Sequence, residues 1–318
     1  MSSERILTAL ESKLFSDYLV VLGREAIPFI ILRNYEGFPS KIGHDLDLFI
    51  PRACCDQAAR LFTKLLGELG GRVIITHRRD YFFDIRFTVD LDVSKAIHLD
   101  LFHGSFTWHG IPYLTEDDLL SSARDYNGLP IPRPAHEALN LLFASILWGG
   151  FLKERYLPRI SALLAEPTEQ DIFASCIDHV FGAGCRVPFP LTTDTIPTKS
   201  VIFAYAKLAR SGLKRTALKR APFKTISALV RHWFAEAQCY LRLKGIHIAI
   251  LGPDGAGKST VMAHTVERIG ELFAERHFYH WRPSVMPEIG VLMAAEKPPK
   301  PLLSIRMESL HILRFPLS

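Results

Sequence analysis

The chain has 318 residues, and its hydrophobic share of 48% with 11% aromatic residues excludes an intrinsically disordered protein. The length is enough for two domains, each with its own core. No apolar stretch approaches the roughly 18 residues of a membrane-spanning helix, and the net charge of +5 is too small to predict nucleic-acid binding.

The cysteines and the first residues bear on the compartment of the protein. Its cysteines are odd in number and show none of the paired CxxC spacings of a zinc site, which favours reduced, small core residues. Residues 1–5 lead into mixed polar sequence without the apolar core of a signal peptide. We therefore expect a cytoplasmic protein.

The first predicted strands carry a pair of aspartates. Residues 29–32 read as a strand, 33–40 as a loop and 44–50 as a second strand that ends before a proline. The two-residue period of a strand places Asp45 and Asp47 on one face and their apolar neighbours on the other. Two adjacent carboxylates repel each other unless a cation lies between them, so the pair predicts a Mg²⁺ site.

A later strand, 97–102, repeats the pattern with Asp100 between apolar residues. Beside Asp45 and Asp47 it would complete a three-carboxylate site for two metal ions and in-line attack on an α-phosphate. The alternative is that all three are ordinary solvent-facing residues on edge strands. Other candidates for the third ligand are Asp80, Asp84, Asp90 and Asp92. We interpret the flanking His98 and His103 as residues at the rim of the sheet.

Between the two aspartate strands, 53–69 has helical spacing, and 72–76 and 81–88 are predicted strands. The order of strand, helix and several strands predicts an α+β domain.

This pattern resembles the nucleotidyltransferase superfamily over about residues 18–159. The resemblance implies that Asp45 and Asp47 are the metal-binding pair and Asp100 the third carboxylate. The family usually has Gly-Ser in the turn before the aspartates, where it grips nucleotide phosphates. Arg33 and Asn34 stand there in this chain, and Arg33 could bind phosphate through its charge.

The middle of the chain is predicted to be helical. A proline-rich connector at 130–134 precedes a strongly apolar helix over 135–148, which Gly149-Gly150 ends. The following segment, 151–156, carries basic residues and could either face the aspartate site or form a surface turn. Further helices are predicted at 159–164, 169–181, 202–213 and 225–243.

The region 195–235 contains no acidic residue. Its basic residues are Lys199, Lys207, Arg210, Lys214, Arg215, Lys219, Arg220, Lys224 and Arg231. Such a segment could contact phosphate, nucleic acid or an anionic membrane surface, or it could be the solvated face of a linker helix. Of the macromolecular partners we retain peripheral membrane contact as a hypothesis and do not expect nucleic acid.

The most specific motif is a phosphate-binding loop. The apolar run 246–251 reads as a buried strand, 252–260 spells GPDGAGKST, and 259–273 has helical spacing. The predicted nucleotide contacts are Gly252, Asp254, Gly255, Ala256, Gly257, Lys258, Ser259 and Thr260. Lys258 is expected to reach the β and γ oxygens of ATP, and the Ser259 hydroxyl to bind Mg²⁺.

The region from Lys244 onward resembles a thymidylate-kinase-like protein. Bacterial chains that join such a domain to a nucleotidyltransferase-like one are often associated with surface polysaccharide synthesis. A role of this chain in that synthesis is implied by the resemblance alone. No aspartate follows Asp254, so the later Asp-Arg motif and the arginine-bearing lid of these kinases have no match. Since only about 60 residues follow the loop, the expected domain is truncated.

We therefore predict a nucleotidyltransferase-like α+β domain at 1–134, a helical middle with a basic linker at 135–243, and a partial P-loop α/β domain at 244–318. The first functional hypothesis is an ATP-binding, thymidylate-kinase-like phosphotransferase using Lys258. The second is Mg²⁺-dependent nucleotidyl or phosphoryl transfer by Asp45, Asp47 and Asp100 to a sugar or lipid-linked acceptor. The third is a nucleotide-binding protein without turnover.

Overall fold

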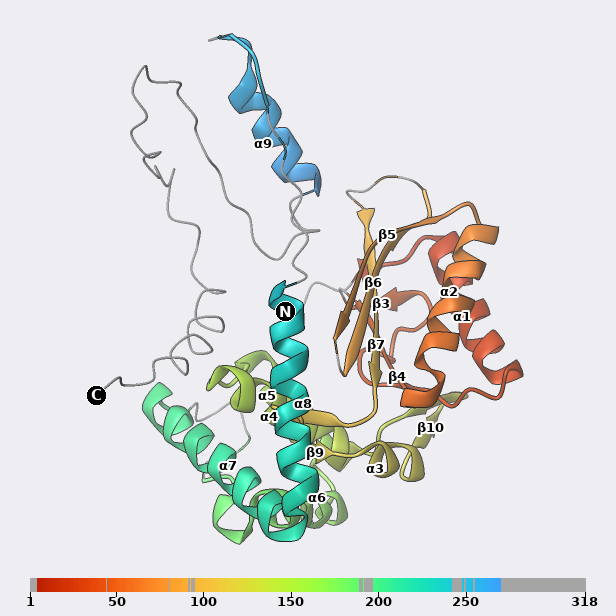
Figure 1. The fold of residues 1–318 in the computed structure, drawn as a ribbon. Coiled ribbons are helices and arrows are strands. Elements are labelled where there is room, and N and C mark those ends of the chain that lie inside the picture. Colours follow the sequence, from red (N-terminus) through yellow and green to blue (C-terminus); the bar gives the residue numbers. More distant parts are fainter. Residues whose placement is uncertain are drawn as a thin grey trace, which may run out of the picture. The chain divides into compact units, whose positions relative to one another are not determined.

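The computed structural model describes residues 5–43, 45–79, 81–90, 92, 95–188, 191, 197–241, 248, 250–253 and 255–269. The chain divides into two compact units, Met1–His247 and Ile248–Ser318. The described part of the chain is mixed α/β (Figure 1). Among the described residues, no helix combines the length and the apolar character that crossing a bilayer requires.

The first unit is built on a mixed five-stranded sheet with the order β2-β4-β7-β6-β5. The central pair, β4 and β7, is parallel, whereas each of the other neighbouring pairs is antiparallel. The strands are β2 (Ile30–Ile31), β4 (Asp45–Ile50), β7 (Ile97–His103), β6 (Phe82–Thr88) and β5 (Arg72–Arg79). The five strands predicted from the sequence are thereby confirmed, apart from small differences at their ends.

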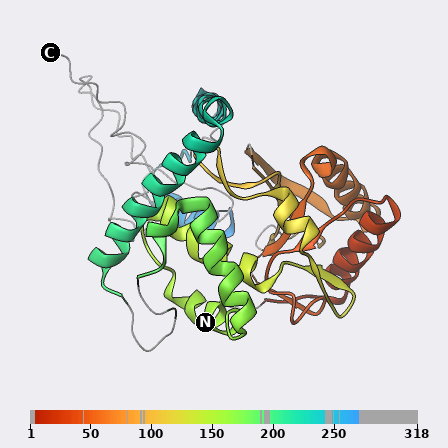
Figure 2. The ribbon, with the colours of Figure 1, turned by 90° about the horizontal axis from the view of Figure 1, so that it is seen from below.

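Two helices, α1 (Ala9–Arg24) and α2 (Cys55–Glu68), lie together on one side of this sheet (Figures 1 and 2). They share a core with Leu46, Leu48 and Leu101, the apolar alternate residues of β4 and β7. The sequence analysis predicted α2 but missed α1, although a Thr8–Glu11 capping box marks where α1 begins. Covering this face buries the leucines and leaves the aspartates on the opposite face.

The helical middle packs against the end of the sheet and belongs to the same compact unit. Its helices are α4 (Pro134–Gly149), α5 (Leu157–Leu163), α6 (Pro167–Phe181), α7 (Lys199–Arg220) and α8 (Pro222–Leu241). The buried apolar residues of α4, α5, α6 and α7 belong to one cluster with Ile30, Leu32 and Phe49 of the sheet region, and Leu229 of α8 packs against it. The predicted middle helices are confirmed, and Gly150 ends α4 in the left-handed conformation with φ 67°.

Short elements connect these parts. They are β1 (Arg5–Ile6), β3 (Lys41–Ile42), η1 (Arg52–Cys54), β8 (Phe106–Trp108), β9 (Ile111–Leu114), α3 (Glu116–Ser121), β10 (Arg124–Tyr126), β11 (Leu129–Ile131), η3 (Glu154–Tyr156) and η4 (Ala183–Cys185). The pairs β1–β3, β8–β9 and β10–β11 form separate two-stranded sheets.

In the second unit the described residues contain one helix, α9 (Lys258–Ile269). This confirms the helix predicted behind the phosphate loop as far as residue 269; the rest of that prediction lies outside the described residues. The predicted buried strand 246–251 is wrong where it can be checked. Ile248 and Leu251 are 55% and 85% exposed, and neither they nor Ile250 belong to a strand.

Candidate functional site

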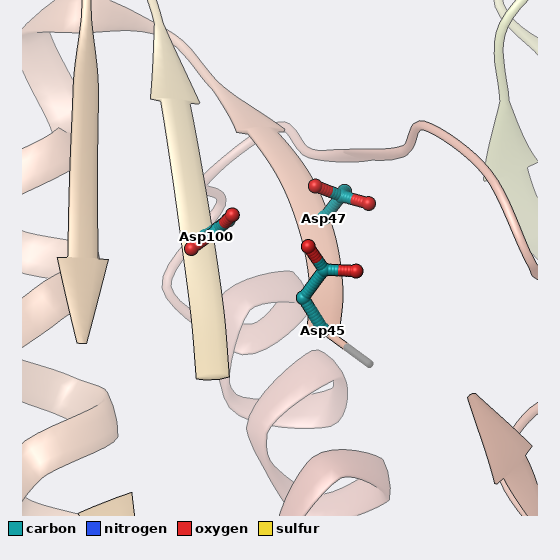
Figure 3. A group of neighbouring side chains, drawn as sticks. All are labelled: Asp45, Asp47 and Asp100. Atoms are coloured by element: carbon teal, nitrogen blue, oxygen red, sulfur yellow. The ribbon is translucent and has the colours of Figure 1, made fainter. Parts of the chain in front are cut away.

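The structure brings the three predicted aspartates together. In the parallel register of β4 and β7, Asp47 lies opposite Asp100, and Asp45 lies opposite His98. Asp45, Asp47 and Asp100 each offer a carboxylate oxygen, and these oxygens all lie within 4.8 Å of one another. Figure 3 shows the three side chains on the same face of the two strands. The predicted alternation of aspartates on one face and leucines on the other is therefore confirmed.

A fourth carboxylate continues this row. Asp84 on β6 lies opposite Asp100 in the antiparallel register, so Asp47, Asp100 and Asp84 occupy three neighbouring strands at the same level. Arg86 Nε donates a hydrogen bond of 3.0 Å to Asp84 Oδ2. Asp84 thus lies beside Asp100, but among the described residues the carboxylates within 4.8 Å of one another are those of Asp45, Asp47 and Asp100, so Asp100 is the third member of the group.

The other aspartate alternatives are separate from this row or lie outside the described residues. Asp90 and Asp92 both form ion pairs with Lys95, at 2.9 and 3.6 Å. Their partner lies on the segment before β7, away from the row that Asp100 defines. Asp80 lies outside the described residues.

Burial dominates the electrostatics of the site. Asp47 is 1% exposed, and burial, opposed by Arg33, raises its pKa to about 6. Burial, followed by repulsion from Asp47 and Asp45, raises the pKa of Asp100 to about 9. The Asp100 side chain therefore carries a proton near neutral pH when no cation is present.

Two buried oxygens in the row lack a hydrogen-bond partner among the described residues. They are Oδ1 of Asp84 and Oδ1 of Asp100. A buried acceptor without a donor is costly, and hard oxygen atoms of this kind are the ligands that Mg²⁺ prefers. The three carboxylates of Asp45, Asp47 and Asp100, with the unpaired Oδ1 of Asp100, therefore fit a divalent cation.

Arg33 follows β2 and lies against the aspartate pair. Its Nε and Nη2 donate to the two carboxylate oxygens of Asp47, and Nη2 also donates to Asp45 Oδ2 at 3.4 Å. These contacts and the buried carboxylate raise the pKa of the guanidinium above its usual value despite desolvation. The sequence analysis expected Arg33 to bind phosphate, whereas in the structure its charge compensates the carboxylates. Phosphate binding by Arg33 stays a prediction.

The segment between α4 and α5 faces the site. The Tyr156 hydroxyl accepts a hydrogen bond of 2.8 Å from Arg33 Nη1. Lys153 Nζ and the Arg155 guanidinium lie over the Tyr156 ring, 5.5 and 5.0 Å from its centroid. Lys153 also acts on Asp47, whose pKa it lowers slightly against the effect of burial. The segment 151–156 therefore lies beside the aspartates through Tyr156 and Lys153, while Phe151, Glu154 and Arg155 are exposed at the surface.

A buried polar network fixes this arrangement. The Tyr35 hydroxyl donates to Glu137 Oε2 at 2.9 Å, and Arg159 Nε donates to Glu137 Oε1 at 2.8 Å. Arg159 also pairs with Glu36 at 2.5 Å. The network joins the loop after β2 to α4 and α5, and so fixes the positions of Arg33 and Tyr156 relative to each other. Sequence reasoning missed it; the signal was Glu137, a charged residue near the start of a strongly apolar helix.

The flanking histidines have different surroundings. His98 is half-buried and lies opposite both Asp45 and Arg86 in the sheet. His103 is the last residue of β7, which agrees with a position at the end of the sheet, but its side chain is only 4% exposed.

The predicted phosphate-binding loop of the second unit has a left-handed backbone conformation at two of its glycines. Gly255 and Gly257 have φ values of 84° and 76°, in the region that favours glycine. Lys258 is the first residue of α9, and its Nζ donates to the carbonyl oxygens of Gly252 and Pro253 at 2.7 and 2.6 Å. The Lys258 ammonium group therefore lies next to the first residues of the loop. A lysine that binds a phosphate held by this loop would also need to lie there.

The remaining loop residues are only partly described. Ala256 donates its backbone N–H to the Pro253 carbonyl at 3.2 Å, and Ser259 and Thr260 are exposed at the start of α9. Asp254 lies outside the described residues. Comparison with protein-family models and with curated proteins finds no match to this chain.

Proposed function

We propose that the first unit is a Mg²⁺-dependent transferase that moves a nucleotidyl or phosphoryl group. The observation that carries the proposal is the convergence of the carboxylates of Asp45, Asp47 and Asp100, with a buried, unpaired oxygen on Asp100. The resemblance to nucleotidyltransferases, stated above for the same three residues, agrees with it. The acceptor class that we propose is a sugar or a lipid-linked acceptor.

The residues of the chain have distinct parts in this proposal. Asp45, Asp47 and Asp100 would hold Mg²⁺, which when bound neutralises phosphate charge and favours ionisation of an attacking hydroxyl. Burial and the repulsion of its neighbours raise the pKa of Asp100 to about 9, and a bound cation would favour its ionised form, so that the proton would go to solvent. Arg33 orients Asp47 through two hydrogen bonds.

Phosphate binding falls to the basic segment that faces the aspartates. Lys153 is half-buried and Arg155 is exposed, and both lie beside Tyr156, which contacts Arg33. Two cations at this position can neutralise phosphate oxygens while the carboxylates bind the metal ion. This segment would thereby replace the Gly-Ser turn that Arg33 and Asn34 do not provide.

The test compares wild type with Asp100→Asn and with Asp171→Asn, an exposed residue of α6 that serves as the matched control. We expect Asp100→Asn to weaken Mn²⁺ binding in calorimetry by about tenfold or more and to abolish pyrophosphate release from nucleoside triphosphates. The control should behave as wild type. Unchanged Mn²⁺ affinity in Asp100→Asn would rule out the proposed metal site.

A second candidate function is ATP binding and phosphoryl transfer at the loop of the second unit. The positive φ of Gly255 and Gly257 and the reach of Lys258 over the loop favour it. If ATP binds there, Lys258 and the loop amides would neutralise its phosphates, and Ser259 would bind Mg²⁺. Lys258→Ala should abolish Mg²⁺-dependent ATP binding in calorimetry but leave Mn²⁺ binding by the aspartates unchanged. ATP binding without transfer would favour a nucleotide-binding protein without turnover.

The cytoplasm is the compartment that we propose for this chemistry. ATP and Mg²⁺ are available there, and reduced cysteines are stable there. Cys54, Cys55, Cys176 and Cys185 are free thiols in the described part of the chain.

A further inference from the structure

One face of α8 exposes large apolar side chains. They are Phe223 (87% exposed), Ile226 (52%), Val230 (62%), Trp233 (42%) and Phe234 (65%). At 3.6 residues per turn these positions fall within an arc of roughly 100°. We call this set the α8 apolar stripe. A continuous apolar arc on a surface helix differs from the scattered single residues that are normal on protein surfaces.

The opposite face of α8 fixes how the helix is turned. Thr225 and His232 are 6% and 5% exposed, and the His232 ring lies 5.0 Å from that of His109. A Cβ atom built on Gly110 would come within 2.6 Å of the Ala228 carbonyl oxygen, so the hairpin of β8 and β9 approaches α8 closely. Because these contacts hold the other face in place, Phe223, Ile226, Val230 and Phe234 are directed outward. Trp233 lies at the edge of the stripe, where its ring stacks on that of His109 with centroids 6.0 Å apart. Figure 2 looks almost along α8.

Cations border the stripe. Lys224 and Arg231 are exposed on α8, and each lies roughly 80–100° around the helix from Phe223. Lys219 is exposed in the last turn of α7, directly before α8 begins. No acidic residue occurs in the whole region 195–235. The one acidic residue of α8, Glu236, follows this region and lies roughly 140° around the helix from Phe223, toward the packed face. The combination of an apolar arc and a basic flank is that of a helix that lies in a membrane interface.

We propose that α8 docks the protein on an anionic lipid surface, with the α8 apolar stripe inserted among the acyl chains and Lys219, Lys224 and Arg231 at the headgroups. Charge decides between possible occupants. A second copy of this chain would bring the same cations against each other, whereas an anionic membrane is complementary to them. This inference is independent of the proposed reaction.

The test is co-sedimentation of the full chain with two kinds of vesicles, pure phosphatidylcholine and phosphatidylcholine mixed with phosphatidylserine. We expect the protein to bind the mixed vesicles, and Phe223→Ser combined with Phe234→Ser to weaken this binding by about tenfold or more. Lys224→Ala combined with Arg231→Ala should also weaken it, and added salt should do the same to wild type. Emission from Trp233, identified by its loss in Trp233→Phe, should shift to shorter wavelength on binding.

Matched controls come from the first unit. Val20 on α1 is an exposed apolar residue (52%), and Lys64 on α2 is an exposed cation (75% of its side chain). Val20→Ser and Lys64→Ala should bind vesicles as wild type does. The proposal is overturned if wild type binds neither kind of vesicle, or if the double phenylalanine variant binds as tightly as wild type. Lipid-free dimerisation that this variant abolishes would assign the stripe to a second copy instead.

Discussion

The guanidinium of Arg33 binds both carboxylate oxygens of Asp47, and its Nη2 lies 3.1 Å from Asp47 Oδ1. Asp47 is 1% exposed, so this pair compensates a charge that has almost no access to water. It also determines how Asp47 is presented to Asp45 and Asp100. The contact connects the loop after β2 with the centre of the sheet.

Loss of Arg33 should therefore be costly. We expect Arg33→Gln to lower the free energy of unfolding by about 2–3 kcal/mol, because a buried carboxylate is left without its cation and the arginine itself is partly exposed. Urea unfolding measures the change. Mn²⁺ should restore part of the loss if the aspartates bind a divalent ion.

The matched control is Arg78→Gln, since Arg78 forms an ion pair with Asp56 and both side chains are more than half exposed. An exposed pair contributes less than about 1 kcal/mol. Equal effects of the two arginine substitutions would contradict the assigned role of Arg33.

The pKa of Asp100 predicts how stability depends on pH in metal-free protein. Its pKa is about 9 in the folded protein, against the ordinary value of 3.8 for an aspartate in the unfolded chain, so between these pH values the folded state binds the proton more tightly. Stability from this group is therefore greatest at low pH and is lost as pH rises toward about 9, with a limiting slope of about 1.4 kcal/mol per pH unit. Asp47 also lowers the free energy of unfolding as pH rises, over the narrower range between pH 3.8 and about pH 6.

Asp100→Asn should remove the fall in the free energy of unfolding between about pH 6, the pKa of Asp47, and about pH 9, the pKa of Asp100. Urea midpoints measured in the presence of a chelator, from about pH 6 to pH 9, should fall for wild type and stay flatter for Asp100→Asn. Parallel curves for the two proteins would show that Asp100 does not hold a proton in this range.

The Tyr35 hydroxyl should contribute through Glu137. Tyr35→Phe removes the donor to Glu137 Oε2 and an acceptor for Arg159, and we expect a loss of about 1–3 kcal/mol in the free energy of unfolding. Thermal or urea unfolding measures it. Tyr126 lies against Tyr35 with ring centroids 5.2 Å apart, and its hydroxyl has no hydrogen bond among the described residues. Tyr126→Phe is therefore the control and should change stability by less than about 0.5 kcal/mol.

Gly257→Ala tests the backbone of the phosphate loop. A Cβ at Gly257 would meet no atom within 4 Å. The substitution should therefore act only through the backbone, because an alanine at a φ of 76° costs about 1–2 kcal/mol of conformational energy. We expect ATP binding to weaken by about tenfold in calorimetry. Gly67→Ala on α2 is the control, because its Cβ would also meet no atom within 4 Å and its φ is not positive. An equal loss of ATP binding in Gly67→Ala would contradict the role given to the loop conformation.

The sequence by itself determined the local parts of this protein. Period-two alternation placed Asp45 and Asp47 opposite the leucines of the same strand, because successive side chains of any strand point to opposite faces. Helical spacing located α2, α4 and α6 to within a few residues, and the glycines of the loop marked the start of α9. These features depend on neighbours along the chain. The predicted strand 246–251 is wrong at its described positions, and strand formation, unlike these features, depends on a partner from elsewhere in the chain.

Only the tertiary structure decided the composition of the site. The parallel register of β4 with β7 set Asp47 opposite Asp100, and the antiparallel register of β6 brought in Asp84. Arg33 and Tyr156 are 123 positions apart, yet they share a hydrogen bond. Strand register and contacts between distant residues cannot be read from residue types and local spacing. They depend on how the whole first unit buries its two apolar clusters.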